Sequence, residues 1–262
     1  MAALVYAGVW EFSVSKYLDG FSDSIVPNSA PAVQKVEAIL KWMRVGANRE
    51  VAADPEALDL RDPGNTLVYQ QLLAVCGTAT NAFLNLARSS DLRVRRLLLL
   101  GQDHRAKHVV AEVLIEGRWV IVDPAYRTLM RDKRGRLLTR SELRDPATFA
   151  EATQGIPNYP REYSYESIAH VRVARLPLEG LQLRRILEKV YPGWDESFDW
   201  SLLLERESAA ALALAVFSTC IFIVLRFALG WYADRHLRVP RIHLREKALR
   251  VGAALFTSPE IK

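Results

Sequence analysis

The sequence predicts a domain of the α+β class followed by a single transmembrane helix. Two runs of β-branched residues joined by a Gly-containing pair are typical of a β-hairpin, and other stretches repeat apolar residues at helical spacing. An uncharged run of eighteen residues, Ser208–Leu225, begins a longer apolar stretch that suits a membrane span. The length of 262 residues is enough for one domain with additional segments.

Charge is distributed unevenly between these two parts. The chain has 35 basic and 30 acidic side chains and a formal net charge of +5. Residues 1–207 carry 27 of each sign, so the whole basic excess lies in residues 208–262. This pattern argues against a nucleic-acid-binding surface, which would need basic residues on the domain itself. With two cysteines, the composition also excludes a disulfide-stabilised scaffold.

These patterns divide the chain into five segments. They are an N-terminal region of helix and loop (1–65), the core of the domain (66–127), a C-terminal extension of the domain (128–207), the transmembrane helix (208–232) and a basic juxtamembrane tail (233–262).

The N-terminal region is predicted to hold one clear helix. Residues 1–30 are mixed in character and end in turn signals. Between Pro31 and about Gly46 apolar residues recur at helical spacing, which predicts a helix. Residues 48–65 are polar, contain proline and glycine, and predict a loop.

The core has the most regular pattern. It predicts a helix over Cys76–Ser89, a strand over Arg93–Leu100, a loop over Gly101–Lys107, and a hairpin with strands His108–Ile115 and Arg118–Val122 joined by Glu116-Gly117. The extension predicts a helix over Leu138–Phe149 with Thr139 as N-cap, a strand over Ala169–Ala174 and a short helix over Leu181–Val190. Between them, Tyr159–Tyr165 predicts an aromatic loop whose tyrosines could line a cleft, although an ordinary packed loop is the favoured interpretation.

The hairpin register places His108 and Asp123 on one face of the sheet. With Glu116 and Gly117 as the turn, Val110 faces Asp123, and residues two apart share a face. Glu112 joins the same face. A carboxylate beside an imidazole fixes its tautomer and raises its basicity.

Cys76 stands at the first position of a predicted helix. The helix dipole and the free amide groups at that end favour the thiolate. For an isolated cysteine, a buried structural thiol would be the ordinary interpretation. Together with a separate His and Asp, however, Cys76 completes the set of groups that a thiol acyl-transfer enzyme uses.

Two segments, VYQQLLAVCGTATNAFLNLARSSDLRVRRLLL and HVVAEVLIEGRWVIVDPAY, resemble the transglutaminase-like superfamily of papain-type cysteine enzymes. The most specific part is H-x-x-x-E-x-x-x-x-G-x-W-x-x-x-D-P, from His108 to Pro124. The resemblance covers residues 66–127 and implies a papain-like fold, with a Cys-bearing core helix packed on an antiparallel sheet. It also implies Cys76 as nucleophile, His108 as general base and acid, and Asp123 as the group that orients the histidine.

The match has two departures and one open position. Ala74-Val75 precedes the cysteine where the family commonly has Gly-x, and Asp91 stands at the usual turn glycine. Gln70, six residues before the cysteine, resembles the papain-type glutamine that donates to the oxyanion. Gln71 could serve instead, and a surface glutamine without a role is the plainer alternative.

The resemblance implies a thiol-dependent enzyme that transfers an acyl group from an amide bond of a peptide or protein, either as a peptidase or amidase or as a transglutaminase. The alternative is a non-catalytic transglutaminase-like binding module or accessory protein at the membrane. No cofactor is implied. His104, His108 and Glu112 have a metal-ligand spacing only on a helix, and the β-branched residues among them favour a strand, so no metal site is predicted.

The apolar stretch 208–232 is predicted to contact membrane lipid, with Trp231 and Tyr232 at one interface. A buried helix of a soluble protein is the alternative. In either case Cys220 is expected to act as a small apolar residue that faces lipid or another helix. The basic tail, residues 233–262, is expected on the cytoplasmic side and against anionic headgroups, with the domain outside the cytoplasm. Met1–Trp10 lacks the basic start of a signal peptide, which argues against that orientation.

Overall fold

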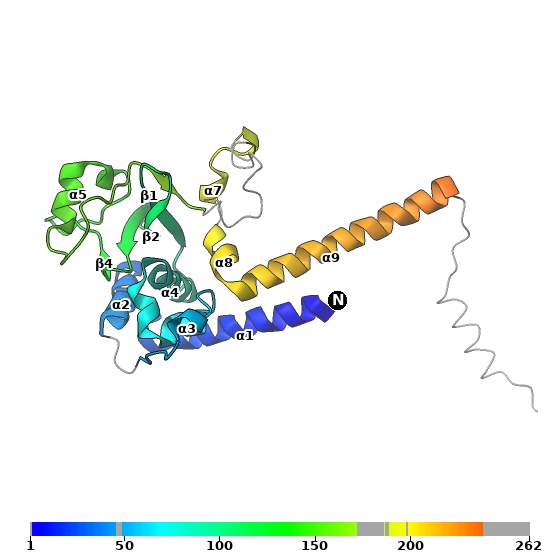
Figure 1. Ribbon diagram of the computed structural model, residues 1–262, viewed down its shortest axis with the longest axis horizontal. Coiled ribbons are helices and arrows are strands. Elements are labelled where there is room, and N and C mark those ends of the chain that lie inside the picture. Colours follow the sequence, from blue (N-terminus) through cyan, green and yellow to red (C-terminus); the bar gives the residue numbers. More distant parts are fainter. Residues whose placement is uncertain (1, 46–48, 172–185, 187–188, 198, 238–262) are drawn as a thin grey trace, which may run out of the picture. The chain divides into compact units, whose positions relative to one another are not determined.

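The computed structural model describes residues 2–45, 49–171, 186, 189–197 and 199–237 (Figure 1). The chain divides into two compact units, Met1–Ala215 and Val216–Lys262. The first unit contains the predicted domain, and each unit is described by itself.

A five-stranded antiparallel sheet forms the centre of the first unit. Its strands follow the order β4-β3-β2-β1-β5, and their bounds are β1 Val94–Leu100, β2 Ala106–Ile115, β3 Arg118–Asp123, β4 Thr128–Leu129 and β5 Ile168–Ala169. This arrangement confirms the predicted α+β class with an antiparallel sheet.

The hairpin of β2 and β3 has the predicted register. Ile115 lies opposite Arg118, and Glu112 lies opposite Ile121. The turn residues Glu116 and Gly117 have φ angles of 50° and 78°, as a two-residue turn with both φ angles positive requires. Strand β2 begins two residues earlier than predicted, which leaves the pairing unchanged.

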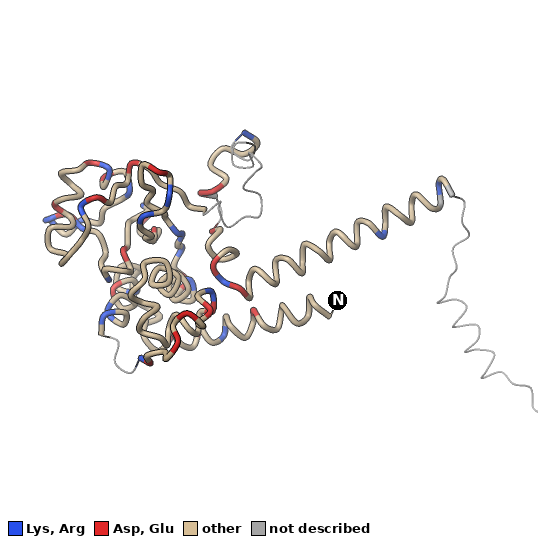
Figure 2. Tube along the Cα trace, in the orientation of Figure 1, with Lys and Arg blue, Asp and Glu red and all other residues tan. Residues whose placement is uncertain are grey.

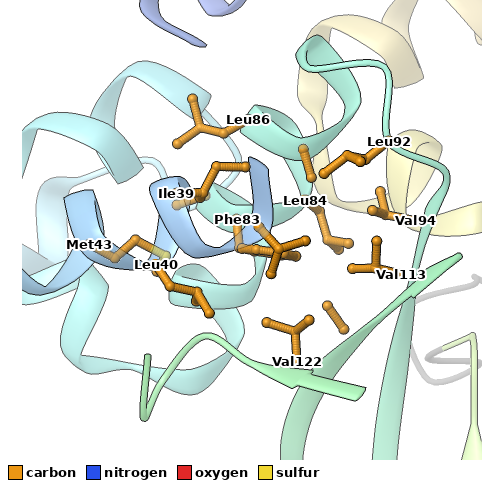
Figure 3. Close-up of a cluster of buried hydrophobic side chains, with 14 of the residues drawn as sticks. Ile39, Leu40, Met43, Phe83, Leu84, Leu86, Leu92, Val94, Val113 and Val122 are labelled. Atoms are coloured by element: carbon orange, nitrogen blue, oxygen red, sulfur yellow. The ribbon is translucent and has the colours of Figure 1, made fainter. Parts of the chain in front are cut away.

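Helix α4 (Cys76–Ser89) begins and ends where the sequence predicts and covers one face of the sheet. Figure 3 shows Phe83 and Leu84 of α4 between the sheet residues Val113 and Val122 and helix α2 (Ala32–Val45). Burying each such side chain contributes about 1.5–3 kcal/mol. Helix α1 (Ala2–Ile25) also packs on α4, so α4 is enclosed on several sides and its first residue is held in a defined place.

The other face of the sheet has a core of its own. Val110 and Ile121 point to this face, and the chain from Met130 to Tyr165 supplies most of the cover. The residues of this core are Leu97, Leu99, Val110, Ile121, Met130, Leu138, Leu143, Phe149, Tyr159 and Tyr165.

The N-terminal region is more helical than predicted. Residues 1–30 were expected to be mixed, but α1 occupies Ala2–Ile25; its only buried residues are Ala7, Leu18 and Ser22, so its sequence carries little amphipathic signal. The predicted loop 48–65 contains a 3₁₀ turn, η1 (Pro55–Ala57), and the start of helix α3 (Pro63–Val68). Asp62 caps α3, and proline occupies the first position of the helix. The polar composition of this segment did not indicate that a helix starts here.

The predicted helix over Leu138–Phe149 is wrong. The backbone N–H of Leu138 donates to the carbonyl of Met130, and its carbonyl accepts from the N–H of Ile121. Thr139 lies opposite Val120, so this segment extends the sheet. The Thr139 hydroxyl does accept from the backbone N–H of Glu142, but the helical segment there is only the short turn η3 (Glu142–Arg144). Helix α5 (Pro146–Thr153) then starts afresh with Asp145 as N-cap, because proline cannot stand inside a helix.

The rest of the extension differs from the prediction in part. The strand over Ala169–Ala174 is the two-residue β5, and residues 172–174 and most of the predicted helix 181–190 lie outside the described residues. Two short helices, α7 (Trp194–Ser197) and α8 (Trp200–Glu205), come next in the chain. Glu205 of α8 forms an ion pair of 2.5 Å with buried Arg96 of β1, which fixes α8 to the domain.

Helix α9 (Glu207–Tyr232) has 26 residues and is long and apolar enough to cross a membrane. Most of its side chains are exposed, including Cys220, whereas a core helix would be covered. It begins in the first unit and continues in the second. A π-helical turn comes after it over Ala233–Leu237, and the basic residues from Arg238 onward lie outside the described residues.

Candidate active site

The structure places Cys76 at the first position of α4. It comes after the 3₁₀ turn η2 (Gln70–Ala74) and the extended residue Val75, which offers no side-chain cap. The first amide groups of the helix therefore have no partner within the helix and point toward the thiol end. The hydroxyl of Thr78 bonds back to the carbonyl of Val75 at 3.1 Å and fixes this entry. Cys76 itself is half-buried.

His108 and Asp123 are brought together as the hairpin register predicts. His108 Nε2 lies 2.7 Å from Asp123 Oδ2, and both side chains are almost fully buried. The Thr80 hydroxyl donates to the Val109 carbonyl at 3.0 Å. Because this bond ties the first turns of α4 to the residue after His108, it holds the thiol beside the imidazole.

Four hydrogen bonds surround the Asp123 carboxylate. Oδ1 accepts from the backbone N–H groups of Ala125 and Tyr126 at 3.1 and 3.3 Å. Oδ2 accepts from the Tyr159 hydroxyl at 2.8 Å as well as from His108. Among the described residues no lysine or arginine forms an ion pair with it. The buried charge is therefore supported by hydrogen bonds and by the imidazolium alone.

The electrostatics of the site favour an imidazolium and a thiolate. Burial opposes the charging of His108, but its hydrogen bonds to Asp123 and Cys76 outweigh this effect and raise the pKa of His108 to about 9. The hydrogen bond with His108 lowers the pKa of the Cys76 thiol against the effect of burial, and the backbone of Val109 and Gly77 adds to the lowering. Because Nε2 of His108 bonds Asp123, the buried Nδ1, which has no hydrogen-bond partner within the geometric limits among the described residues, is the ring atom left to face the thiol.

Three tyrosines surround the imidazole, and the sequence assigned none of them a role in the site. The Tyr163 ring is stacked on His108, with ring centroids 4.4 Å apart and planes 6° apart. Tyr159 and Tyr126 approach the imidazole edge-on at 6.3 and 5.9 Å. The sequence favoured an ordinary packed loop for residues 159–165; the one signal was the density of tyrosines.

Glu112 shares the face of His108 but does not contact it. Its Oε2 is 2.6 Å from Arg95 Nε and 3.0 Å from His170 Nε2, and the carboxylate is fully buried. Burial opposes ionisation, and the bonds to His170 and Arg95 outweigh it, so the pKa of Glu112 is lowered. His170, to which the sequence assigned no role, therefore belongs to a second buried ionic cluster that also contains Arg95.

Gln70, the expected oxyanion donor, has an exposed side chain and makes no side-chain hydrogen bond to any residue described. The amide of Gln71 is engaged in both directions with the backbone of Ala52, at 3.3 and 3.2 Å. The Gln71 side chain is thus occupied by its hydrogen bonds to the loop at Ala52. The role of Gln70 as an oxyanion donor stays a prediction.

Arg127 joins the two segments that carry the thiol and the carboxylate. Its guanidinium donates to the carbonyl of Leu73, just before Cys76, at 3.2 Å, and to that of Ala125, just after Asp123, at 2.6 Å. Sequence reasoning did not single out this residue. Its effect is to fix the spacing of the two loops across the site.

The surface beside the site is hollowed next to the stacked tyrosine. A hollow of about 580 Å³ is lined by Gly101, Gln102, Asp103, Lys107, Glu162 and Tyr163. Within the described residues no group of three His, Cys, Asp or Glu side chains could hold a metal ion.

The chain was compared with family models, with curated proteins and with solved structures. Residues 19–124 match the family model of the transglutaminase-like superfamily. No curated protein matches the chain. A candidate cysteine protease from Cytophaga hutchinsonii is similar in structure over 47% of this chain and 40% of its own, at 17% identity and a TM-score of 0.33. The chain thus spans less than half of that protein.

The matched range includes the cysteine, the histidine and the aspartate described above. The match reaches further toward the N-terminus than the resemblance found in the sequence, because it includes the end of α1 and all of α2. It supports a thiol enzyme as the general kind of protein. Residues 19–124 of the chain are therefore similar to the transglutaminase-like superfamily.

Proposed function

We propose that this protein is a thiol-dependent enzyme that transfers an acyl group from an amide bond. Cys76 is the nucleophile, His108 the general base and acid, and Asp123 the group that positions the histidine. The observation that carries the proposal is that His108 lies between the Asp123 carboxylate and the Cys76 thiol, with the pKa of the thiol lowered by that contact.

The first half-reaction forms a thioester. The Cys76 thiolate attacks the amide carbonyl carbon, and a C–S bond forms while the carbonyl oxygen becomes negative. The free amide of Cys76 at the start of α4 supports this oxygen, and Gln70 is the candidate for a second donor. The proton on Nδ1 of His108 passes to the leaving nitrogen as the C–N bond breaks.

The second half-reaction releases the acyl group. Water or a primary amine gives a proton to His108 and attacks the thioester, and the C–S bond breaks to return the thiolate. Water gives a carboxylic acid, which is the reaction of a peptidase or amidase. An amine gives a new amide, which is the reaction of a transglutaminase. Neither route needs a cofactor.

The tyrosines support the histidine in this scheme. Tyr159 holds Oδ2 of Asp123 in the position from which it bonds the imidazole. Tyr163 covers one face of the imidazole and excludes water from it. Both are positioning residues, because they act through His108 or Asp123.

The substrate class we propose is a peptide or protein, and the enzyme works at a membrane. Helix α9 supplies the anchor by length and composition. The basic residues after it set the orientation, with the tail in the cytoplasm and the domain outside it. The hollow beside Tyr163 is a recess in which a peptide could lie.

Alkylation of the thiol tests the chemistry without a known substrate. The full chain with Cys220→Ser retains Cys76 as its one cysteine, and an iodoacetamide-type reagent then reports on that thiol alone. We expect fast labelling at neutral pH that falls at least ten-fold in His108→Ala. A matched control is His104→Ala, which removes a histidine from the nearby exposed loop.

Equal, slow labelling in all three proteins would contradict an activated thiol. That result would favour the non-catalytic binding module, in which the three residues are retained without reacting. For the substrate, Cys76→Ala serves as a trap, because it keeps the site and prevents the thioester from forming.

A further inference from the structure

We propose that the first half of α1, residues Ala2–Phe12, lies in the surface of the lipid bilayer that α9 crosses. This inference rests on the proposed membrane anchor and adds a second contact, made by the domain itself. The large apolar side chains Val5, Tyr6, Val9 and Phe12 of this segment are 62–71% exposed.

The exposed residues form one continuous stripe. Val5, Val9 and Phe12 have the i, i+4, i+7 spacing and therefore lie on one side of the helix, with Tyr6 next to them. A soluble protein rarely leaves a contiguous apolar surface of this kind in water. Something apolar therefore covers the stripe.

The stripe carries no charge. Residues 2–10 contain no acidic or basic side chain, and the first charged side chain, Glu11, is turned away from the stripe. Its carboxylate is 3.0 Å from Arg206 and accepts a 2.7 Å hydrogen bond from the Ser208 hydroxyl. An isolated carboxylate would be costly at a lipid surface, and this one is neutralised within the protein.

The same contacts tie the stripe to the place where α9 begins. Ala7 of α1 and Ala209 of α9 are both buried, at 4% and 7% exposure. The first turns of α9, up to Ala215, belong to the same compact unit as α1. A bilayer that receives α9 from these turns therefore lies within reach of the stripe. Figure 2 shows the start of α1 and most of α9 free of charged residues.

Length and charge limit how far the segment enters the bilayer. The eleven residues Ala2–Phe12 span about 16 Å as a helix, whereas the hydrocarbon core is about 30 Å thick. Lys16, the next charged residue on the striped side, lies over the Phe12 ring at 5.9 Å. A lysine there suits the headgroup layer, where its ammonium group stays hydrated. The segment thus enters one leaflet and does not cross.

Spin labels at single cysteines test this placement in the full chain. In a Cys76→Ser, Cys220→Ser background, nitroxides are attached at Val5→Cys or Val9→Cys, and the protein is reconstituted in vesicles of phosphatidylcholine and phosphatidylglycerol. Two further positions calibrate the measurement: Val51→Cys, on the domain surface, reports water, and Phe222→Cys, within α9, reports lipid. These two side chains are 73% and 71% exposed.

We expect the ratio of oxygen to nickel-chelate collisions at positions 5 and 9 to exceed that at position 51 at least three-fold, and to approach that at position 222. If position 222 reports lipid while positions 5 and 9 match position 51, this inference fails and the anchor stands. If the collision ratios at positions 5, 9 and 222 all match the ratio at position 51, both this inference and the proposed membrane anchor fail. Dipolar broadening between labels at position 9 of separate molecules, with both labels shielded from oxygen, would show that a second copy covers the stripe and would overturn the inference.

Discussion

Tyr159 donates a 2.8 Å hydrogen bond to Asp123 on the same carboxylate oxygen that contacts His108. The two residues are 36 positions apart in the sequence, and both are buried on the face of the sheet opposite α4. The tyrosine thus completes a set of four hydrogen bonds to a carboxylate that, among the described residues, has no cationic partner other than the histidine.

Replacing Tyr159 with phenylalanine leaves one lone pair of that buried carboxylate without a partner. We expect the free energy of unfolding to fall by about 1–3 kcal/mol, the usual cost of leaving a buried hydrogen-bond acceptor without a donor. We also expect slower alkylation of Cys76 by several-fold, because the histidine is held less firmly. Urea unfolding and iodoacetamide labelling measure the two effects.

Tyr126→Phe is the matched control for that variant. Its hydroxyl makes a long hydrogen bond, of 3.5 Å, to the exposed carbonyl of Asn158 and also contacts the Tyr163 hydroxyl, but it makes no hydrogen bond to Asp123. We expect little change in stability or alkylation. If Tyr126→Phe and Tyr159→Phe behave alike in both measurements, the bond to Asp123 does not position the histidine.

The pH dependence of alkylation should report the coupled thiol and imidazole. The pKa of Cys76 is lowered from the ordinary 9.0, first by its hydrogen bond with His108. The thiolate therefore persists below pH 9, and the labelling rate falls only as the pH drops through the lowered pKa. In His108→Ala the inflection should move upward toward 9. An inflection at the same pH in both proteins would contradict the coupling.

Stability should depend on pH through His108 once the thiol no longer titrates. In Cys76→Ser, we expect the bond to Asp123 to keep the pKa of His108 above the ordinary 6.5, but below the value of about 9 that the Cys76 contacts help to reach in the native protein. The stabilisation is then complete below pH 6.5 and is lost as the pH rises through this folded-state pKa. We expect the free energy of unfolding to decline over this window and the decline to vanish on adding Asp123→Asn. A decline of equal slope in the double variant would assign it to other groups.

Two variants of Tyr163 distinguish the effect of its stacked ring from the effect of its hydroxyl. Its ring covers the imidazole at 4.4 Å, so Tyr163→Ala exposes that face to water and removes a contact that favours the imidazolium. We expect alkylation of Cys76 to slow by several-fold in Tyr163→Ala and to be restored in Tyr163→Phe. Equal losses in both variants would mean that the hydroxyl, and not the stacked ring, is what matters.

The parts of the site that the sequence predicts are the parts set by local patterns. The register from Ile115 to Arg118 determines which face His108 occupies, and the helix that starts at Cys76 is periodic enough to recognise. The family resemblance then assigns roles to these residues. By contrast, Tyr159 and Tyr163 reach the site from a loop without periodicity, and no local rule states where such a loop folds back.

Two segments whose secondary structure differs from the prediction, residues 138–149 and α1, also lack a decisive local pattern. Leu138 and Thr139 alternate in a way that fits either a helix start or a short extension of the sheet, and the pairing with Val120 and Met130 decides for the sheet. Helix α1 is not predicted because residues 2–10 are apolar on both the exposed and the buried side, so hydrophobic periodicity carries no information about this part of the helix.

The buried cluster of Glu112 should govern stability and not chemistry. Its carboxylate is fully buried between Arg95 at 2.6 Å and His170 at 3.0 Å, and it does not touch His108. Glu112→Gln keeps the shape but removes the buried charge beside Arg95, which then keeps the partly exposed Glu196 at 3.5 Å, so the cost is up to about 3–5 kcal/mol. The control Lys133→Gln removes one member of an exposed ion pair with Glu151, which costs less than about 1 kcal/mol.

We expect urea unfolding to show a larger loss in the free energy of unfolding for Glu112→Gln than for Lys133→Gln. The folded fraction of Glu112→Gln should still alkylate Cys76 at the native rate. A small loss of stability together with a large loss of thiol reactivity would instead place Glu112 in the reaction itself.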